Sequence, residues 1–427
     1  MCIRKLFVIL IIINLFFTSV VYADDIDDME IIDWTEDVIE TANNKEEPKL
    51  NSRAAIIYDR KSKRVIWGKA ENERRPMAST TKIMTAIVVI ENANLNDTVT
   101  VSKKAAGTGG SRLGLKAGDK ITVNNLLYGL LLVSGNDSAV ALAEYIGGSI
   151  EGFAEKMNKK AEELGLENTH FITPHGLDMP EHYTTAIELA KMADYALNIE
   201  KFASIVNTKY ITISINGRSK DLKNTNELLG NLYGVNGVKT GFTNGANRCL
   251  VTSVNRDGMN IITVVLGADT KKDRTNDSVK LIEYAYANYE IYNLEDIINE
   301  KYSEWKKINE QRINVIKGKE ENINTKLEEL DNYYFPIKKL DKEKINVKIF
   351  NINEITAPIQ KDTYIGKLCV YIDDEKILEL TISTDKAINK LEFIDYLKSF
   401  IVNNIKNMEI GIRGRSLNPC FCMKRVF

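Results

Sequence analysis

The sequence is poor in the residues that build metal sites and histidine-dependent hydrolases. It has only three histidines in 427 residues, His170, His175 and His182, and contains neither an H-E-x-x-H nor a C-x-x-C motif. Zinc is held by closely spaced histidines and cysteines, and a Ser-His-Asp triad needs a histidine as its base. This scarcity argues against both chemistries, and we expect no metal and no cofactor.

Cysteines are also few, and Cys2 lies too close to the start to be a lipoprotein cysteine. The other four lack the dense, regular spacing of a disulfide framework. Cys249 and Cys369 lie in apolar, strand-like runs, which predicts buried free thiols. Cys420 and Cys422 belong to a tail at residues 411–427 that no pattern explains.

No charge of one sign dominates the chain. Its formal net charge is -2, and aromatic residues are not interleaved with basic clusters, so nucleic acid is not an expected partner. The 44% of hydrophobic and 27% of charged residues are typical of a globular protein. The length predicts two or three domains.

The N-terminus has the pattern of a secretory signal peptide at residues 1–23. Arg4 and Lys5 precede an apolar run from Leu6 to Val21, and Ala23 offers a cleavage site. The alternative is an uncleaved anchor, but the run is short for a membrane span. We therefore expect a protein secreted across the cytoplasmic membrane, beginning with an acidic linker at residues 24–48.

Residues 49–292 read as one domain of the α/β (α+β) class. Two short strands come first, a helical region follows, and apolar strands and a last helix close the domain, which predicts an antiparallel sheet flanked by helices. Asp137 is expected to cap one helix. The expected strands are 54–58, 64–67, 249–254 and 260–268, and the expected helices are 83–90, 124–133, 138–146, 150–164, 184–197 and 274–289.

The rest of the chain is predicted to form a smaller domain. Residues 293–312 read as a charged connector, and residues 313–388 as a β-rich domain of short strands. Residues 389–410 have an amphipathic helical pattern. This helix could pack on the β-rich domain or lie on a membrane surface, and the pattern leaves both open.

The chemistry points first to Ser79-Thr80-Thr81-Lys82, which has the form S-x-x-K. Residues three apart share one face of a helix, so Lys82 can reach Ser79 and take its proton. The motif leads into the apolar run 83–90, which reads as a buried helix. Alone, such a pair can arise by chance.

Two later motifs supply what a lysine-activated serine still needs. Ser134 and Asn136 lie in a loop between two apolar helices, and Lys239-Thr240-Gly241 follows about 100 residues later. Each alone is as well explained by a capped turn or by a strand end with a turn glycine. All three in this order indicate a serine acyl-transfer site.

At this point the sequence from about Ser52 to Tyr289 resembles the serine-type D-alanyl-D-alanine carboxypeptidases, the penicillin-binding proteins of low molecular mass. The three motifs carry the resemblance together with two further stretches, 173–178 (TPHGLD) and 224–229 (NTNELL). The β-rich domain resembles the family's C-terminal domain more loosely, around 357–359 and 366–368. The resemblance implies a fold like that of serine β-lactamases and transpeptidases.

The resemblance also implies a role for each site residue. Ser79 would attack the penultimate D-alanine carbonyl of a peptidoglycan stem peptide, Lys82 would be the base, and Ser134 would pass a proton to the leaving D-alanine. Other residues would bind the substrate: Asn136 its amide, and Lys239 and Thr240 its terminal carboxylate. Gly241 would let the substrate backbone lie close to the strand. The backbone N–H groups of Ser79 and Phe242 would form the oxyanion hole. β-Lactam antibiotics would acylate Ser79, and the C-terminal helix would hold the protein at the outer face of the cytoplasmic membrane.

Two other functions remain as alternatives. A class A β-lactamase shares the three motifs but needs a glutamate that activates water, and Glu227 lies too close to Lys239 in sequence for that part. A non-catalytic penicillin-sensing or wall-binding protein would not need the intact set of polar residues. One departure from the family is the stretch 244–248 (NGANR), which puts the geometry of that loop in doubt.

Overall fold

The computed structural model describes residues 46–414, which form two units. The first unit contains residues 46–292 and 334–339, and the second contains residues 293–333 and 340–414. The predicted signal peptide, most of the acidic linker, and Cys420 and Cys422 lie outside the described residues.

The first unit is built on a five-stranded antiparallel sheet with the order β2-β1-β9-β8-β7. The central strands are buried on both faces, which is why their sequences are continuous apolar runs rather than alternating ones. The strands are β1 (Ala54–Asp59), β2 (Arg64–Lys69), β7 (Val235–Thr243), β8 (Asn247–Arg256) and β9 (Met259–Ala268).

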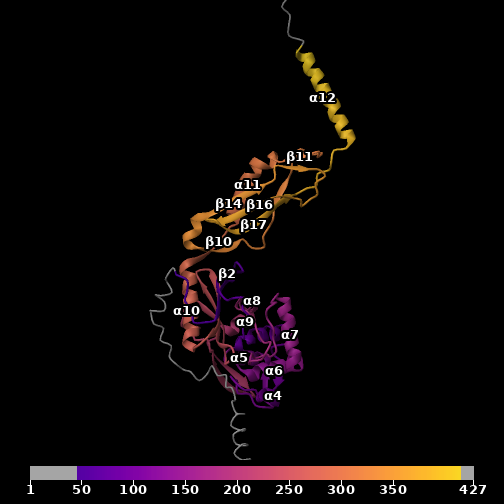
Figure 1. The fold of residues 1–427 in the computed structure, drawn as a ribbon. Helices are drawn as coiled ribbons and strands as arrows, with labels where there is room; N and C mark the ends of the chain where they lie inside the picture. The colour runs from indigo at the N-terminus through magenta and orange to yellow at the C-terminus, as the bar shows by residue number, and fades with distance from the viewer. Residues whose placement is uncertain (1–45, 415–427) are drawn as a thin grey trace, which may run out of the picture. The chain divides into compact units, whose positions relative to one another are not determined.

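Helices cover both faces of this sheet (Figure 1). On one face α10 (Lys271–Asn288) packs through Val279 and Ile282 against Ile57 and Leu250. The other face carries a larger helical layer, made of α4 (Lys103–Ala106), α5 (Val123–Leu131), α6 (Asn136–Gly147), α7 (Ile150–Glu163), α8 (Ala186–Leu197) and α9 (Glu200–Val206) around α3 (Lys82–Asn92).

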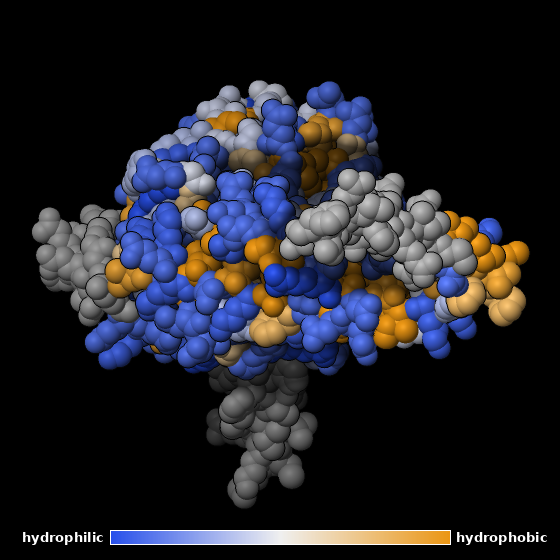
Figure 2. Space-filling model, turned by 90° about the horizontal axis from the view of Figure 1, so that it is seen from above, coloured by the Kyte–Doolittle hydropathy of each residue, from blue (hydrophilic) through white to orange (hydrophobic). Residues whose placement is uncertain are grey.

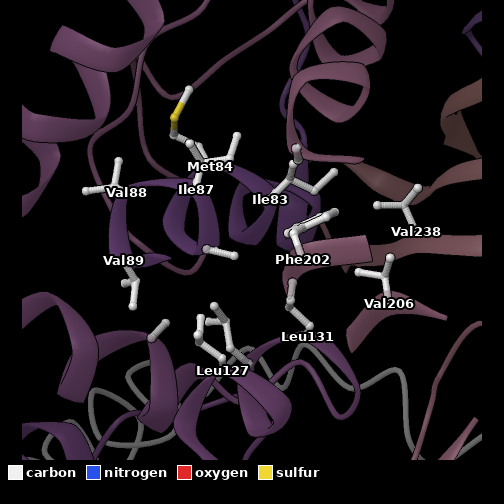
Figure 3. Packing of buried hydrophobic residues seen from close by; sticks show 14 of the residues in the cluster. Ile83, Met84, Ile87, Val88, Val89, Leu127, Leu131, Phe202, Val206 and Val238 are labelled. Carbon is white, nitrogen blue, oxygen red and sulfur yellow. The ribbon is translucent and has the colours of Figure 1, made fainter. Parts of the chain in front are cut away.

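Helix α3 is the centre of the helical layer. Its first eight residues, Lys82 to Val89, are all buried, and Figure 3 shows Ile83 near Phe202 of α9 and Val89 near Leu127 of α5. A helix that is apolar all round must be enclosed by other elements. The residue that opens α3 is therefore held rigidly in the interior.

Two small antiparallel pairs complete the first unit. Strand β3 (Thr98–Thr100) pairs with β4 (Lys120–Thr122), and β5 (Tyr210–Ile215) forms a hairpin with β6 (Arg218–Lys223). Strand β13 (Tyr334–Lys338), from a stretch expected in the C-terminal domain, instead pairs with β10 (Tyr289–Asn293).

The second unit contains a four-stranded sheet with the order β12-β17-β16-β14, and a parallel pair of β11 with β15. The stretch expected to be a connector forms a helix, α11 (Glu295–Asn309), because its Trp305 is buried in a cluster with Ile313, Ile365 and Ile382. The strands are β11 (Asn314–Ile316), β12 (Thr325–Leu327), β14 (Ile345–Asn351), β15 (Glu354–Thr356), β16 (Tyr364–Ile372) and β17 (Glu375–Thr384).

The last described element is α12 (Phe393–Gly414). Much of the described surface seen in Figure 2 is hydrophilic, with smaller hydrophobic patches. In α12, however, Phe393, Phe400, Ile401 and Ile405 are all at least half exposed, so these side chains do not pack on the sheet of the second unit. Within residues 46–414 no helix combines the length and apolar character that crossing a membrane requires.

The fold class is as predicted: an antiparallel sheet with flanking helices, followed by a small β-rich domain. Cys249 and Cys369 are buried free thiols, as their apolar surroundings indicated.

Candidate active site

Ser79 lies in a single 3-10 turn, η1 (Ala78–Thr81), which leads directly into α3. The hydroxyls of Thr80 and Thr81 donate to the carbonyl oxygens of Met77 and Ala78, at 2.6 and 2.8 Å. We expected the motif to open a regular helix. A 3-10 turn has three residues per turn, so it still places Ser79 and Lys82 on one face.

The amine of Lys82 is completely buried and lies 2.8 Å from Ser79 Oγ. It also lies 2.8 Å from Asn136 Oδ1 and 2.8 Å from the carbonyl oxygen of His175. Both of these oxygens can only accept, so each takes an N–H of the amine. If the amine is neutral, its two N–H groups point at these two oxygens, and its lone pair can accept the proton of the Ser79 hydroxyl.

Asn136 is fixed from three sides. Its Nδ2 donates to the carbonyl oxygen of Gly109, and its backbone N–H donates to that of Ser111, both at 2.8 Å. Because Nδ2 donates to Gly109, the amide must point Oδ1 at Lys82. The orientation of the base therefore depends on a glycine-rich loop more than twenty residues earlier in the sequence.

The expected cap by Asp137 is wrong. Helix α6 begins at Asn136, two residues before the expected start, so Asp137 lies inside its first turn, and the Asp137 carboxylate accepts N–H groups from Leu113, Gly114 and Leu115 at 2.8–3.0 Å. A buried carboxylate needs several donors. Three successive backbone N–H groups supply them, so Asp137 fixes the loop after Ser111 rather than the helix end.

Ser134 has a left-handed backbone, with φ of 58°, and is 1% exposed. Its Oγ has no hydrogen-bond partner among the described residues. A buried hydroxyl without a partner is unfavourable in a folded protein, which makes it a candidate for a contact with substrate.

Strand β7 lies against the turn that holds Ser79. A Cβ at Gly241 would be 3.0 Å from the backbone nitrogen of Ser79, a tight contact that the glycine avoids. Thr240 Oγ1 lies 2.9 Å from the hydroxyl of Thr225, and Lys239 is almost fully buried, with Nζ 2.9 Å from the carbonyl oxygen of Thr240. Phe242 is half-buried beneath the guanidinium of Arg248.

The structure thus joins Ser79, Lys82 and Asn136 by direct contacts, and brings Gly241 close to Ser79. Ser134 is two residues from Asn136, and Lys239 and Thr240 immediately precede Gly241. Residues 244–248, which depart from the family's sequence pattern, form a turn that is held by hydrogen bonds. The Asp178 carboxylate accepts from Thr243 Oγ1 and from the Gly245 N–H.

Sequence reasoning missed two contributions to this region. The stretches 173–178 and 224–229 contribute to the family resemblance, but the sequence did not predict that the His175 carbonyl contacts Lys82 or that the Thr225 hydroxyl contacts Thr240. A backbone carbonyl carries no sequence signature, and the Thr225–Thr240 contact joins a loop to strand β7 in space. The His175 ring is no base: burial lowers its pKa to about 3, and Nδ1 accepts from the Leu177 N–H.

Glu227, which was considered as the water-activating glutamate of a β-lactamase, forms ion pairs with residues of α10. Its carboxylate pairs with Lys271 of α10 and lies 3.9 Å from Arg274. A carboxylate held between two cations is a weak candidate for activating water at Ser79.

Comparison with known proteins agrees with this geometry. The family model described as D-alanyl-D-alanine carboxypeptidase matches residues 41–270, and the model of the C-terminal domain of penicillin-binding protein 5 matches residues 302–390. D-alanyl-D-alanine carboxypeptidase DacF of Bacillus subtilis is 36% identical over 81% of this chain and 88% of its own. DacD of Escherichia coli is 30% identical over 83% of this chain and 91% of its own.

Solved structures show the same similarity. The D-alanyl-D-alanine carboxypeptidase DacD from Francisella tularensis superposes with a TM-score of 0.67 at 26% identity, over 82% of this chain and 96% of that one. Penicillin binding protein 5 from Haemophilus influenzae gives a TM-score of 0.65 at 27% identity, over 81% of this chain and 99% of that one. Since the family model covers more than half of the chain and relatives align along most of its length, the chain belongs to the D-alanyl-D-alanine carboxypeptidases, a family of serine hydrolases related to penicillin-binding proteins.

Proposed function

We propose that this protein removes the terminal D-alanine from peptidoglycan stem peptides, with Ser79 as the nucleophile and Lys82 as its base. One observation carries the proposal: the buried Lys82 amine contacts Ser79 Oγ at 2.8 Å while two carbonyl oxygens hold its other positions. This arrangement aims a lone pair of the neutral amine at the serine hydroxyl, as activation of a nucleophile requires.

In the first step Ser79 Oγ attacks the carbonyl carbon of the penultimate D-alanine, and its proton passes to Lys82. The tetrahedral intermediate then expels the terminal D-alanine, whose amine takes a proton relayed through Ser134, and an acyl-enzyme remains. Water attacks the ester in the second step and releases the shortened peptide together with the Ser79 hydroxyl. The partnerless Oγ of Ser134 supports its place in this relay.

The remaining polar groups bind the substrate. The second N–H of Asn136 Nδ2, beyond the one given to Gly109, is available for a substrate carbonyl. The close approach of β7 to η1 supports an oxyanion hole made from the N–H groups of Ser79 and Phe242. Lys239 and Thr240 hold the terminal carboxylate, and Gly241 lets the substrate backbone lie against the strand.

The test is release of D-alanine from diacyl-Lys-D-Ala-D-Ala, together with covalent labelling by a fluorescent penicillin. Ser79→Ala should abolish both activities. Ser278→Ala is a matched control, because Ser278 is also buried and its Oγ has no partner among the described residues. Labelling of Ser79→Ala at the wild-type level would contradict the proposal.

The same assays separate the carboxypeptidase from its alternatives. β-Lactams should inhibit by forming a slowly hydrolysed adduct with Ser79, whereas a β-lactamase would turn them over rapidly and continuously. A non-catalytic sensor would take the label but release no D-alanine.

The site of action is proposed to be outside the cytoplasmic membrane, in accord with the apolar N-terminal segment. We assign membrane association to α12, whose exposed apolar side chains suit an interfacial helix. Replacing Phe400 and Ile405 by aspartate should abolish co-sedimentation with anionic lipid vesicles and leave D-alanine release unchanged. Equal sedimentation of this variant and the wild type would overturn the assignment.

A further inference from the structure

Five basic side chains gather on two neighbouring segments of the helical layer, and we call them the basic rim. Arg112 and Lys116 lie between α4 and β4, Lys120 is the first residue of β4, and Arg218 and Lys220 belong to the β5–β6 hairpin. All five are exposed. A local excess of positive charge stands out in a chain whose formal net charge is -2.

The two segments are joined by specific contacts. The amine of Lys220 donates to the carbonyl oxygen of Leu113, and Asn216 Oδ1 accepts from the Lys120 N–H at 2.6 Å. Asn216 Nδ2 in turn donates to the carboxylate of Asp119. The five charges therefore form one surface.

The acidic side chains of these segments mostly face inward. Asp137 is fully buried on the N–H groups of Leu113, Gly114 and Leu115, and Asp119 is 6% exposed and accepts from the Lys116 N–H. Only Asp221 is exposed, and its carboxylate accepts from Thr212. The surface thus presents mainly cations to solvent.

The basic rim is continuous with the active site. Arg112 follows Ser111, whose carbonyl oxygen accepts from the Asn136 N–H, and Asn136 contacts the Lys82 amine. The Arg112 guanidinium also lies 4.0 Å from the carboxylate of Asp137, the first residue after Asn136. The rim is therefore connected to the Lys82 site through Arg112 and the hydrogen bond between Ser111 and Asn136.

We propose that the basic rim binds carboxylates of the stem peptide that lie upstream of the terminal D-Ala-D-Ala, so that the enzyme prefers acidic peptides over amidated ones. This inference rests on the proposed function of the site. An extended peptide advances about 3.3–3.6 Å per residue, so a carboxylate two or three residues upstream lies roughly 7–11 Å from the reacting carbon. Exposed cations act on such a group mainly by steering and weak ion pairing, and salt screens them.

The experiment compares three substrates: an acidic peptide ending in D-Ala-D-Ala, the same peptide with its upstream carboxylates amidated, and neutral diacyl-Lys-D-Ala-D-Ala. The test variant is Lys116→Gln/Lys120→Gln/Arg218→Gln. The matched control is Lys156→Gln/Lys191→Gln/Lys272→Gln, which removes three exposed lysines of α7, α8 and α10.

We expect the wild type to prefer the acidic peptide, and the test variant to lose about 5- to 10-fold in kcat/KM on that peptide alone, mainly through KM, since exposed pairs contribute up to about 1 kcal/mol each. The control should keep the preference, and raising the ionic strength should erase it. Equal wild-type kcat/KM on the acidic and amidated peptides would overturn the proposal, and so would an equal loss on all three substrates in the test variant. Failure of the proposed function is distinct, because diacyl-Lys-D-Ala-D-Ala would then release no D-alanine.

Discussion

At the scale of single residues, the site depends on two oxygens that can only accept hydrogen bonds and on one hydroxyl that can also donate. Lys82 is surrounded by Asn136 Oδ1, the His175 carbonyl and the Ser79 hydroxyl. No carboxylate is among these three contacts, so they do not favour the ammonium form of the amine by charge.

Asn136→Asp tests this arrangement. A carboxylate beside Lys82 favours the ammonium form, which cannot accept the serine proton. Acylation by penicillin at neutral pH should fall at least about tenfold and recover in part as the pH rises, because a charge this close shifts the protonation equilibrium by at least about one pH unit.

The measurement is the acylation rate against pH, by stopped-flow or gel labelling. Asn125→Asp adds the same charge on α5, where the native side chain bonds only the Ser214 carbonyl, and should keep the wild-type profile. A pH profile of Asn136→Asp that parallels the wild type would contradict this account of the base.

Two buried histidines make stability depend on pH. Burial lowers the pKa of His175 to about 3 and that of His182 to about 4. The unfolded chain binds these protons near pH 6.5, so below that pH it holds more protons than the folded state. The free energy of unfolding should therefore be at its full value above about pH 6.5 and fall on acidification, by up to about 1.4 kcal/mol per pH unit for each histidine.

Urea unfolding between pH 7.5 and 4.5 measures this slope. His182→Gln should make it shallower, since one of the two groups no longer gains a proton on unfolding. An unchanged slope in His182→Gln would show that other groups cause the acid loss.

At the scale of elements, the site is set by how closely two segments approach η1. Strand β7 comes near through Gly241, and the loop of His175 comes near through Gly176, where a Cβ would be 1.9 Å from the carbonyl oxygen of Ala78. Ala78 itself has a φ of 48°, so the turn that carries Ser79 has an unusual backbone held by its neighbours.

Gly176→Ala should be strongly destabilising, because it combines a left-handed backbone with a clash against backbone atoms. We expect a loss of about 2–5 kcal/mol in the free energy of unfolding. Gly165→Ala is the matched control: Gly165 also has a positive φ, but no atom lies within 4 Å of its Cβ position, so it should lose only about 1–2 kcal/mol. Chemical denaturation of both variants checks the difference, and equal losses would show that the contact with Ala78 is unimportant.

At the scale of the whole molecule, each unit has a hydrophobic core of its own. The first unit has apolar clusters on both faces of its sheet, and the second has a smaller cluster around Trp305. A ligand stabilises only the part of a protein to which it is attached.

Calorimetry should therefore show two unfolding transitions, and acylation by penicillin should raise the midpoint of only one of them. Trp305→Ala should lower the other by several degrees, since removing a buried tryptophan costs about 3–5 kcal/mol. A single transition, or a shift of both by penicillin, would refute independent unfolding.

The sequence alone determined the fold class and the family resemblance, and it indicated the residues that we propose for the site. These features are carried by local patterns: apolar runs for buried strands and for α3, and three short motifs in a fixed order. The i, i+3 spacing of Ser79 and Lys82 already placed amine and hydroxyl together, because that relation depends only on local backbone geometry.

Only the tertiary structure decided what surrounds them. The partners of Lys82 come from His175 and Asn136, and the donors to Asp137 come from the loop after Ser111, all distant in sequence. The expected cap at Asp137 and the expected connector before residue 312 differ from the structure for the same reason, because a carboxylate and a tryptophan were buried by contacts with remote segments. Such contacts depend on how the whole chain packs, and no local pattern encodes them.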